Sequence, residues 1–190
     1  LDPGHGGCDT GKFHDTILED EITYDLVTRI KAELKRSTQA RVHTTVLDPD
    51  QQDLPSESSS FTHDQDEVIL TTPNYNPTDT DASVILRMYL ANALYRDELA
   101  RGVKPEKVIF VSIHCDSLPE KLFGTMVYIP GAAYREDEES PDSPFYDGFK
   151  EAQGFRSIVM TPAERQRDEA MSRVFAQTLL DTLQQQQPQI

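Results

Sequence analysis

The sequence predicts an α/β domain built as a three-layer sandwich, with a central mixed β-sheet flanked by helices. Segments whose apolar residues recur at helical spacing alternate along the chain with short runs typical of strands. The clearest strand covers residues 107–114, whose nearly continuous apolar run is typical of a central strand covered on both faces. A chain of 190 residues fits one domain and can bury a sizeable core.

The first strand signal lies at the start of the chain, in residues 1–7, which read as the exit of a buried strand. Pro3 stops the hydrogen-bond ladder, and the glycines let the backbone turn sharply beside His5. A histidine at a strand end is well placed to face a ligand, although a Gly-rich turn with a solvated histidine is the simpler alternative. Because the chain starts inside this pattern, we expect it to lack its first strand.

A helix is predicted from Glu19, because apolar residues follow at helical spacing: Ile22, Leu26, Val27, Ile30 and Leu34. Three acidic residues crowd its first turn, where the helix macrodipole favours negative charge. Glu19 also lies three residues after Thr16, so it could simply cap the helix. Residues 41–47, rich in Val and Thr, predict the next strand.

Two acidic segments, 48–67 and 132–155, read as insertions. The first holds seven acidic residues and no Lys or Arg, together with two prolines and three consecutive serines. We expect both segments to be solvated, mobile loops without regular structure that act as flaps over a groove. A short strand is predicted at 68–71, between the first insertion and the second helix.

The second helix is predicted over residues 82–100, with Asp81 as its N-cap. Its predicted apolar face consists of Val84, Ile85, Met88, Ala91 and Tyr95. A strand at 125–129 follows the central one. The sequence Thr-Pro-Ala-Glu at 161–164 is a complete helix start, and the helix that follows carries a predicted buried side of Met171, Val174, Phe175, Leu179 and Leu183.

Three residues stand out as candidate metal ligands: His5, Glu19 and His114. Two imidazoles and one carboxylate make a catalytic zinc set, which leaves the fourth position for water. A histidine at a strand end is often only a polar residue at the rim of a sheet. The other histidines, His14, His43 and His63, have no comparable setting and are expected at the surface.

These motifs resemble the zinc-dependent N-acetylmuramoyl-L-alanine amidases of bacterial cell walls (amidase type 3). Residues 1–11 are similar to the first motif of that family, and residues 112–117 are similar to its third motif. Leu86-Arg87 and Ala91-Asn92 are similar to a family helix that carries a Leu-x-x-Arg sequence followed by Ala-Asn, although the spacing here is compressed. The second motif is a helix-opening Glu with apolar residues five, seven and eleven positions later, which favours Glu19 over Glu21. The resemblance implies zinc bound by His5, Glu19 and His114.

The activity implied by the resemblance is hydrolysis of the amide between N-acetylmuramic acid and L-alanine in peptidoglycan, in the periplasm or cell envelope, or after secretion, with an activator protein as a further partner. A carboxypeptidase-like zinc hydrolase and a non-catalytic wall-binding zinc module stay open as alternatives. A formal net charge of -15 argues against nucleic acid as a partner, and no apolar run is long enough to span a membrane.

The chain departs from the family pattern in its catalytic Glu. The family carries this residue in a Glu-x-Gly-Phe motif beyond its last helix, and no such segment follows Leu183. Glu151, in residues 151–155, is a near match with spacing one residue too long. We expect that the chain lacks its C-terminal segment, with Glu151 as the remaining candidate. Cys8 and Cys115 lie next to the motifs but are not needed as ligands, and their redox state stays open.

Overall fold

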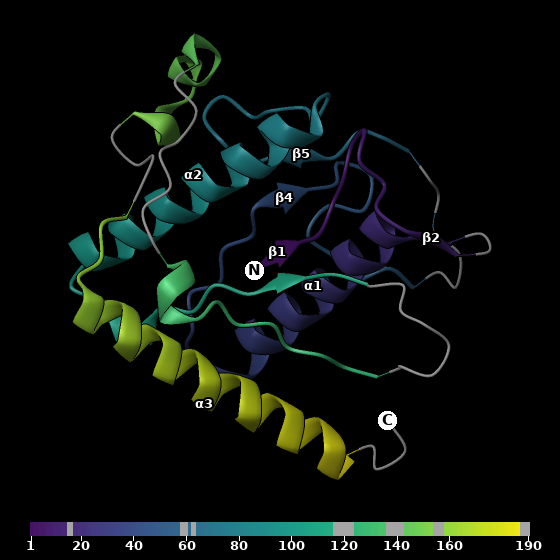
Figure 1. Ribbon diagram of the computed structural model, residues 1–190. Coiled ribbons are helices and arrows are strands. Elements are labelled where there is room, and N and C mark those ends of the chain that lie inside the picture. Colours follow the sequence, from purple (N-terminus) through teal and green to yellow (C-terminus); the bar gives the residue numbers. More distant parts are fainter. Residues whose placement is uncertain are drawn as a thin grey trace. The chain divides into compact units, whose positions relative to one another are not determined.

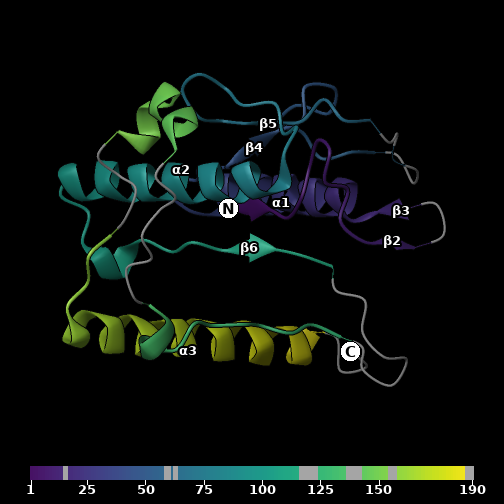
Figure 2. The same cartoon turned by 45° about the horizontal axis from the view of Figure 1, so that its top comes forward.

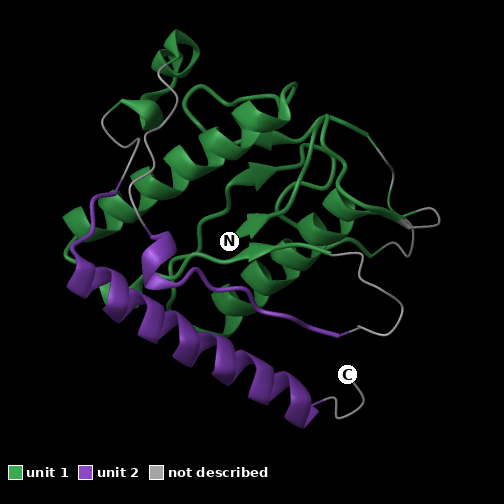
Figure 3. Cartoon of the chain, in the orientation of Figure 1, with its two compact units in different colours: residues 1–116, 140–156 green, residues 117–139, 157–190 purple. Residues whose placement is uncertain are grey.

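The structure is a computed structural model that describes residues 1–14, 17–57, 61, 64–115, 124–135, 143–153 and 158–186. It divides into two compact units (Figure 3): unit 1 comprises residues 1–116 and 140–156, and unit 2 comprises residues 117–139 and 157–190. Unit 1 contains the helices α1 (Glu19–Ser37) and α2 (Thr80–Ala100), and unit 2 contains α3 (Pro162–Gln186) (Figure 1). The chain is therefore a mixed α/β protein.

In the described part of unit 1 the strands are short and form three pairs. β1 (Asp2–Pro3) pairs in parallel with β6 (Ser112–Ile113). The other two pairs are antiparallel, joining β2 (Phe13–His14) to β3 (Ile17–Leu18) and β4 (Val46–Leu47) to β5 (Val68–Ile69).

Single backbone hydrogen bonds link two of these pairs. The N–H of Thr45 donates to the carbonyl of Leu1 and the N–H of Leu70 donates to the carbonyl of Thr45, at 3.2 and 2.9 Å. Four segments thus lie side by side in space, in the order 111–113, 1–4, 43–47 and 68–70. Parallel and antiparallel neighbours both occur among them. The sheets themselves are small, so the three-layer sandwich stays a prediction.

Helix α1 packs against β1 and begins at Glu19, as the sequence predicts. The hydroxyl of Thr23 donates to the carbonyl of Gly4 at 2.8 Å, and Tyr24 and Val27 are buried beside it. Leu18 is the N-cap residue and makes no side-chain cap. Thr16, the predicted capping partner of Glu19, lies outside the described residues. The Glu19 carboxylate accepts hydrogen bonds from the backbone N–H groups of Lys12 and Cys115.

Helix α2 has a different cap and a different buried face from those predicted. Asp79, rather than Asp81, accepts the N-cap hydrogen bond from the N–H of Ala82 at 2.8 Å. Val84 and Met88 are exposed at 62% and 37%. The hydrophobic core that includes this helix combines residues of α2 with residues of β5 and of the segment 146–152: Ile69, Ala82, Leu86, Tyr89, Leu90, Tyr146, Phe149 and Ala152. Apolar residues occur all round this helix, so their spacing does not select a face.

The predicted strands at 107–114 and 125–129 are largely absent from the described residues. Only Ser112–Ile113 is a strand in the first, and Pro105–Lys107 is a 3₁₀ turn, η1. Residues 124–131 form no strand. A strand exists only where a partner supplies hydrogen bonds, and within the described part of the chain the backbone of residues 111–113 pairs with residues 2–4.

The described parts of the two acidic segments contact the helices, and the second contains 3₁₀ turns where no regular structure was predicted, whereas most of residues 48–57 are exposed as expected. In residues 48–57, the carbonyl of Gln52 accepts from the hydroxyl of Tyr24, and Lys31 on α1 pairs with Asp53. Two 3₁₀ turns, η3 (Pro144–Gly148) and η4 (Lys150–Ala152), lie beside α2 and complete its core (Figure 2). Residues 58–60, 62–63, 136–142 and 154–155 lie outside the described residues.

Unit 2 is built on α3 and the 3₁₀ turn η2 (Ala132–Tyr134). The predicted capping box is confirmed, because Thr161 and Glu164 exchange hydrogen bonds between side chain and backbone. Glu169 on α3 accepts from the N–H of Ala132 at 2.6 Å. The predicted buried side of α3 is wrong: Ala176 is its buried residue, and the predicted side is exposed at Met171, Val174, Phe175 and Leu183. None of the described helices has an apolar stretch of bilayer-spanning length.

Candidate metal centre

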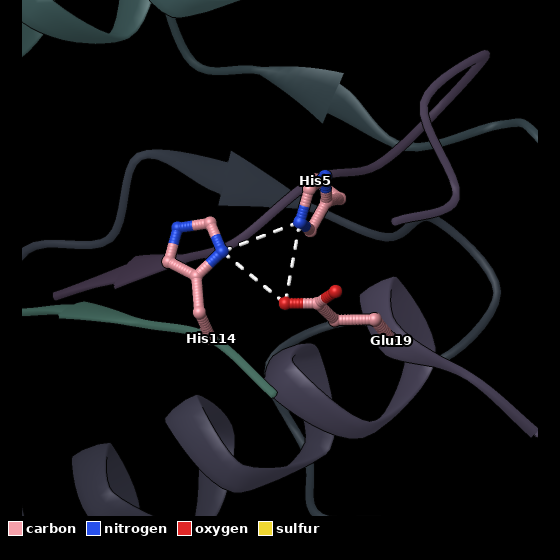
Figure 4. Close-up of side chains that lie close together, drawn as sticks. All are labelled: His5, Glu19 and His114. Atoms are coloured by element: carbon pink, nitrogen blue, oxygen red, sulfur yellow. Dashed lines mark hydrogen bonds and ion pairs between the residues drawn. The ribbon is translucent and has the colours of Figure 1, made fainter. Parts of the chain in front are cut away.

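Three side chains from separate parts of unit 1 meet at one point (Figure 4). His5 follows β1, Glu19 is the first residue of α1, and His114 follows β6. Nε2 of His5, Nδ1 of His114 and Oε1 of Glu19 lie 3.2 Å from one another along all three edges of the triangle. The three residues predicted as ligands are thus brought together.

The size of this triangle fits a tetrahedral metal ion. Zinc binds nitrogen and oxygen ligands at about 2.0–2.1 Å, and a tetrahedron with bonds of that length has edges of about 3.3 Å. The observed edges of 3.2 Å agree with that value. Two imidazoles and a carboxylate also form the donor set of catalytic zinc sites, which keep one position open. The residues present therefore fit the metal that the resemblance implies.

Glu19 is held in its anionic form by the surrounding backbone. Its Oε2 accepts from the N–H of Lys12 at 2.9 Å, and its Oε1 accepts from the N–H of Cys115 at 2.8 Å. Burial alone would raise the pKa of Glu19, but these two hydrogen bonds and the nearby imidazoles outweigh burial and lower it. The carboxylate stays charged, as a metal ligand must be.

His5 sits on a tightly supported turn. Its backbone φ of 67° lies in the left-handed region, which is uncommon for a residue with a side chain. The guanidinium of Arg87 on α2 donates to the carbonyls of Pro3 and His5 and pairs with Asp2 at 3.0 Å. Asp2 in turn accepts from the hydroxyl of Ser112 in β6 at 2.6 Å. This buried network fixes the turn against both α2 and β6.

Two glycines are required by the close approach of the ligands. A Cβ on Gly4 would lie 2.5 Å from Cε1 and Nδ1 of His114, and a Cβ on Gly11 would lie 2.6 Å from Cδ2 of His5 and 2.7 Å from Oε2 of Glu19. Real Cβ atoms do not approach other atoms that closely. Both positions are therefore part of the cradle that holds the three ligands.

The site opens to solvent on the side of His114. The side chain of His114 is 47% exposed, that of His5 is 22% exposed, and that of Glu19 is 3% exposed. The two imidazole rings meet edge to face, with centroids 4.9 Å apart. The buried Glu19 carboxylate therefore lies beneath the two imidazole nitrogens, and a bulky ligand can approach the three atoms from the side of His114.

A family model described as N-acetylmuramoyl-L-alanine amidase matches residues 1–189. The chain belongs to that family. This result confirms the resemblance, and it makes the protein an amidase, a hydrolase of a family that acts on the peptidoglycan of the cell wall. No curated protein and no solved structure matches the chain.

The amidase has a second group of metal-binding residue types that the sequence did not indicate. Oxygens of Glu21, Asp48 and Glu67 lie within 4.8 Å of one another, and all three residues are buried. Burial and the neighbouring carboxylates, Asp20 first among them, raise the pKa of Glu21 to about 8. Glu67 accepts from the N–H of Gly7 at 2.7 Å, so this group lies directly behind the His5 turn. No local spacing links these residues.

Glu151 of the amidase does not join the three ligands. Its two carboxylate oxygens accept from the backbone N–H and the hydroxyl of Thr72, at 2.8 and 2.9 Å. Glu151 is buried in η4, and these bonds fix η4 to the chain after β5. The geometry gives it a structural task.

The remaining sequence candidates lie outside the centre. His43 pairs with Glu98 at 3.2 Å, and the side chain of His14 and all of His63 are outside the described part of the chain. Cys8 and Cys115 are not joined in a disulfide, and Cys115 contacts the centre through its backbone N–H, which donates to Glu19.

Proposed function

We propose that the chain is a zinc-dependent amidase that cleaves the bond between N-acetylmuramic acid and L-alanine in peptidoglycan. The observation that carries this proposal is the triangle of two imidazole nitrogens and one carboxylate oxygen with edges of 3.2 Å. Membership of the N-acetylmuramoyl-L-alanine amidase family supports the choice of bond. The same membership supports action in the periplasm or cell envelope. We also propose the three-layer sandwich and an activator protein as a further partner.

Each of the three residues has a distinct task in this proposal. His5 and His114 supply neutral nitrogen donors through Nε2 and Nδ1, and Glu19 supplies the charge that retains a dication. Zinc bound there would act as a Lewis acid, activating water and polarising the scissile carbonyl. The hydrogen bonds from Lys12 and Cys115 keep the Glu19 carboxylate from rotating away.

The exposure of His114 provides the approach for a polymeric substrate. Because the open side of the triangle lies at His114 and the buried side at Glu19, the scissile amide would enter past the His114 ring. An amide nitrogen leaves only after protonation, which calls for a second carboxylate as general base and acid. Among the described residues, the ligand group itself holds no carboxylate besides Glu19.

The decisive experiment is product analysis on purified peptidoglycan. We expect zinc-loaded protein to release, at a low rate, stem peptides whose new N-termini are L-alanine, because the general base is missing from the ligand group among the described residues, and His114→Ala protein to release none. Release of C-terminal amino acids without new L-alanine N-termini would identify a carboxypeptidase-like hydrolase. Sedimentation with peptidoglycan and no released peptide from the loaded protein would instead indicate a binding module.

A further inference from the structure

We propose that Asp9 is the positioning residue that orients His5 toward the metal. Its carboxylate would accept the Nδ1–H of His5, which leaves Nε2 of the same ring deprotonated and aimed at the centre. The inference rests on the proposed zinc site. It assigns a task to a residue that is not itself a ligand.

The two nitrogens of His5 face different partners. Nε2 lies 3.2 Å from Oε1 of Glu19 and 3.2 Å from Nδ1 of His114, whereas Nδ1 lies 3.1 Å from Oδ2 of Asp9. Which nitrogen of a histidine binds a metal is set by the hydrogen bond that the other nitrogen makes. The carboxylate of Asp9 therefore selects the tautomer that ligation through Nε2 requires.

Nδ1 of His5 is buried and has no well-aligned hydrogen bond to another described residue. The distance of 3.1 Å to Asp9 is short enough for one, so a small rotation of either side chain completes it. A buried donor without an acceptor is unfavourable, and Asp9 holds the acceptor within reach. This geometry favours a bond that tightens when the ring is fixed by a ligand at Nε2.

The backbone places Asp9 for this task. The N–H of Gly6 donates to the carbonyl of Asp9 at 2.7 Å, and the N–H of Asp9 donates back to Gly6 at 3.3 Å, which closes a tight loop over Gly7. Positive φ values at Gly6 and Gly7, 118° and 64°, allow that loop. Oδ1 of Asp9 accepts from the N–H of Gly11 at 3.3 Å. One oxygen is thus anchored to the backbone while the other meets His5.

The test compares zinc affinity and cobalt spectra of four proteins: wild type, Asp9→Ala, Asp9→Asn and Asp9→Glu. Asp97→Asn, which removes an exposed charge from α2, is the matched control. Loss of a carboxylate behind a ligating histidine typically lowers metal affinity by about 10–100-fold. We expect a loss of that order for Asp9→Ala in competition with a chelator, a smaller loss for Asp9→Asn, partial recovery for Asp9→Glu and none for Asp97→Asn.

Cobalt replacing zinc separates positioning from simple loop stability. We expect the visible bands of bound Co²⁺ to shift in Asp9→Ala, because the His5 ring is no longer fixed, while thermal melting shows that the metal-free variant is folded. Zinc affinity within twofold of wild type, with an unchanged cobalt spectrum, would overturn the assignment of Asp9. A wild-type protein that binds no stoichiometric zinc would overturn the proposed function itself.

Discussion

Nε2 of His5 and Nδ1 of His114 lie 3.2 Å apart although 109 positions separate the two residues along the chain. The parallel pairing of β1 with β6 produces this closeness, because it sets Asp2 opposite Ser112 and Pro3 opposite Ile113. His114 directly follows β6 and His5 follows β1 after Gly4, so both lie at the carboxyl ends of these strands, where parallel sheets place their sites. The register of two short strands therefore decides whether a metal centre exists.

Removing either histidine should remove the metal. We expect wild-type protein to hold one zinc ion per chain at neutral pH, and His5→Ala or His114→Ala to hold none, because Glu19 and one imidazole cannot complete the ligand set. Elemental analysis after gel filtration measures this directly. His43→Ala, which loses a pairing with Glu98 on α2, is the control and should keep its zinc. One zinc per chain in both ligand variants would show that the assignment is wrong.

Gly4→Ala should damage the centre without removing a ligand. The added Cβ would lie 2.5 Å from the His114 ring and 2.8 Å from the carbonyl of Ile113, so the ring and β6 must both move. We expect a stability loss of about 1–3 kcal/mol, typical of overpacking, together with weaker zinc binding. Denaturant melts and chelator competition give the two values.

Gly148→Ala provides the comparison for this substitution, because a Cβ there meets no heavy atom within 4 Å. It should leave zinc affinity unchanged. Equal zinc affinity in the Gly4 and Gly148 variants would contradict the tight approach of His114 to Gly4.

Glu151→Ala should cost stability and leave zinc in place. The substitution removes both hydrogen bonds to Thr72 and leaves a backbone N–H without its acceptor, at a cost of about 1–3 kcal/mol. Thermal melting and metal analysis of the same sample check the two parts. A variant that melts like wild type but loses peptidoglycan hydrolysis would show instead that Glu151 takes part in the chemistry.

Acidic residues behind the His5 turn should make the metal-free protein less stable as pH rises. Burial first, and then repulsion from Asp64 and Asp48, raise the pKa of Glu67 above its usual value of 4.5 against the opposing hydrogen bond from Gly7. The folded state therefore binds a proton more tightly than the unfolded state, so the free energy of unfolding falls as pH rises above 4.5. Glu21 acts with the same sign up to its pKa of about 8.

Glu67→Gln tests this slope, because the amide oxygen can still accept from the N–H of Gly7. Urea melts between pH 5 and 8, with a chelator present, should show a smaller decrease of stability with pH in the variant than in wild type. Parallel pH profiles for the two proteins would mean that Glu67 does not titrate differently on folding.

Local patterns of sequence were sufficient for several features. The Thr161–Glu164 capping box depends only on neighbouring residues, as does the start of α1 at Glu19, and both are present in the structure. The three candidate ligands could be named because family motifs have a fixed local form. For the same reason, the sequence placed His5 and His114 after strands without specifying how those strands pair.

Only the tertiary structure decided which distant side chains meet. Asp2 and Arg87 are 85 positions apart, and Gly7 and Glu67 are 60 apart, yet each pair forms a buried hydrogen bond that holds the His5 turn. The sequence predicted Glu67 to be part of a solvated acidic loop, because the composition of residues 48–67 does not indicate that Glu67 bonds to Gly7. Contacts of this kind depend on how whole segments pack, and the free energy of burying a charge is set by the partner it meets rather than by its neighbours in sequence.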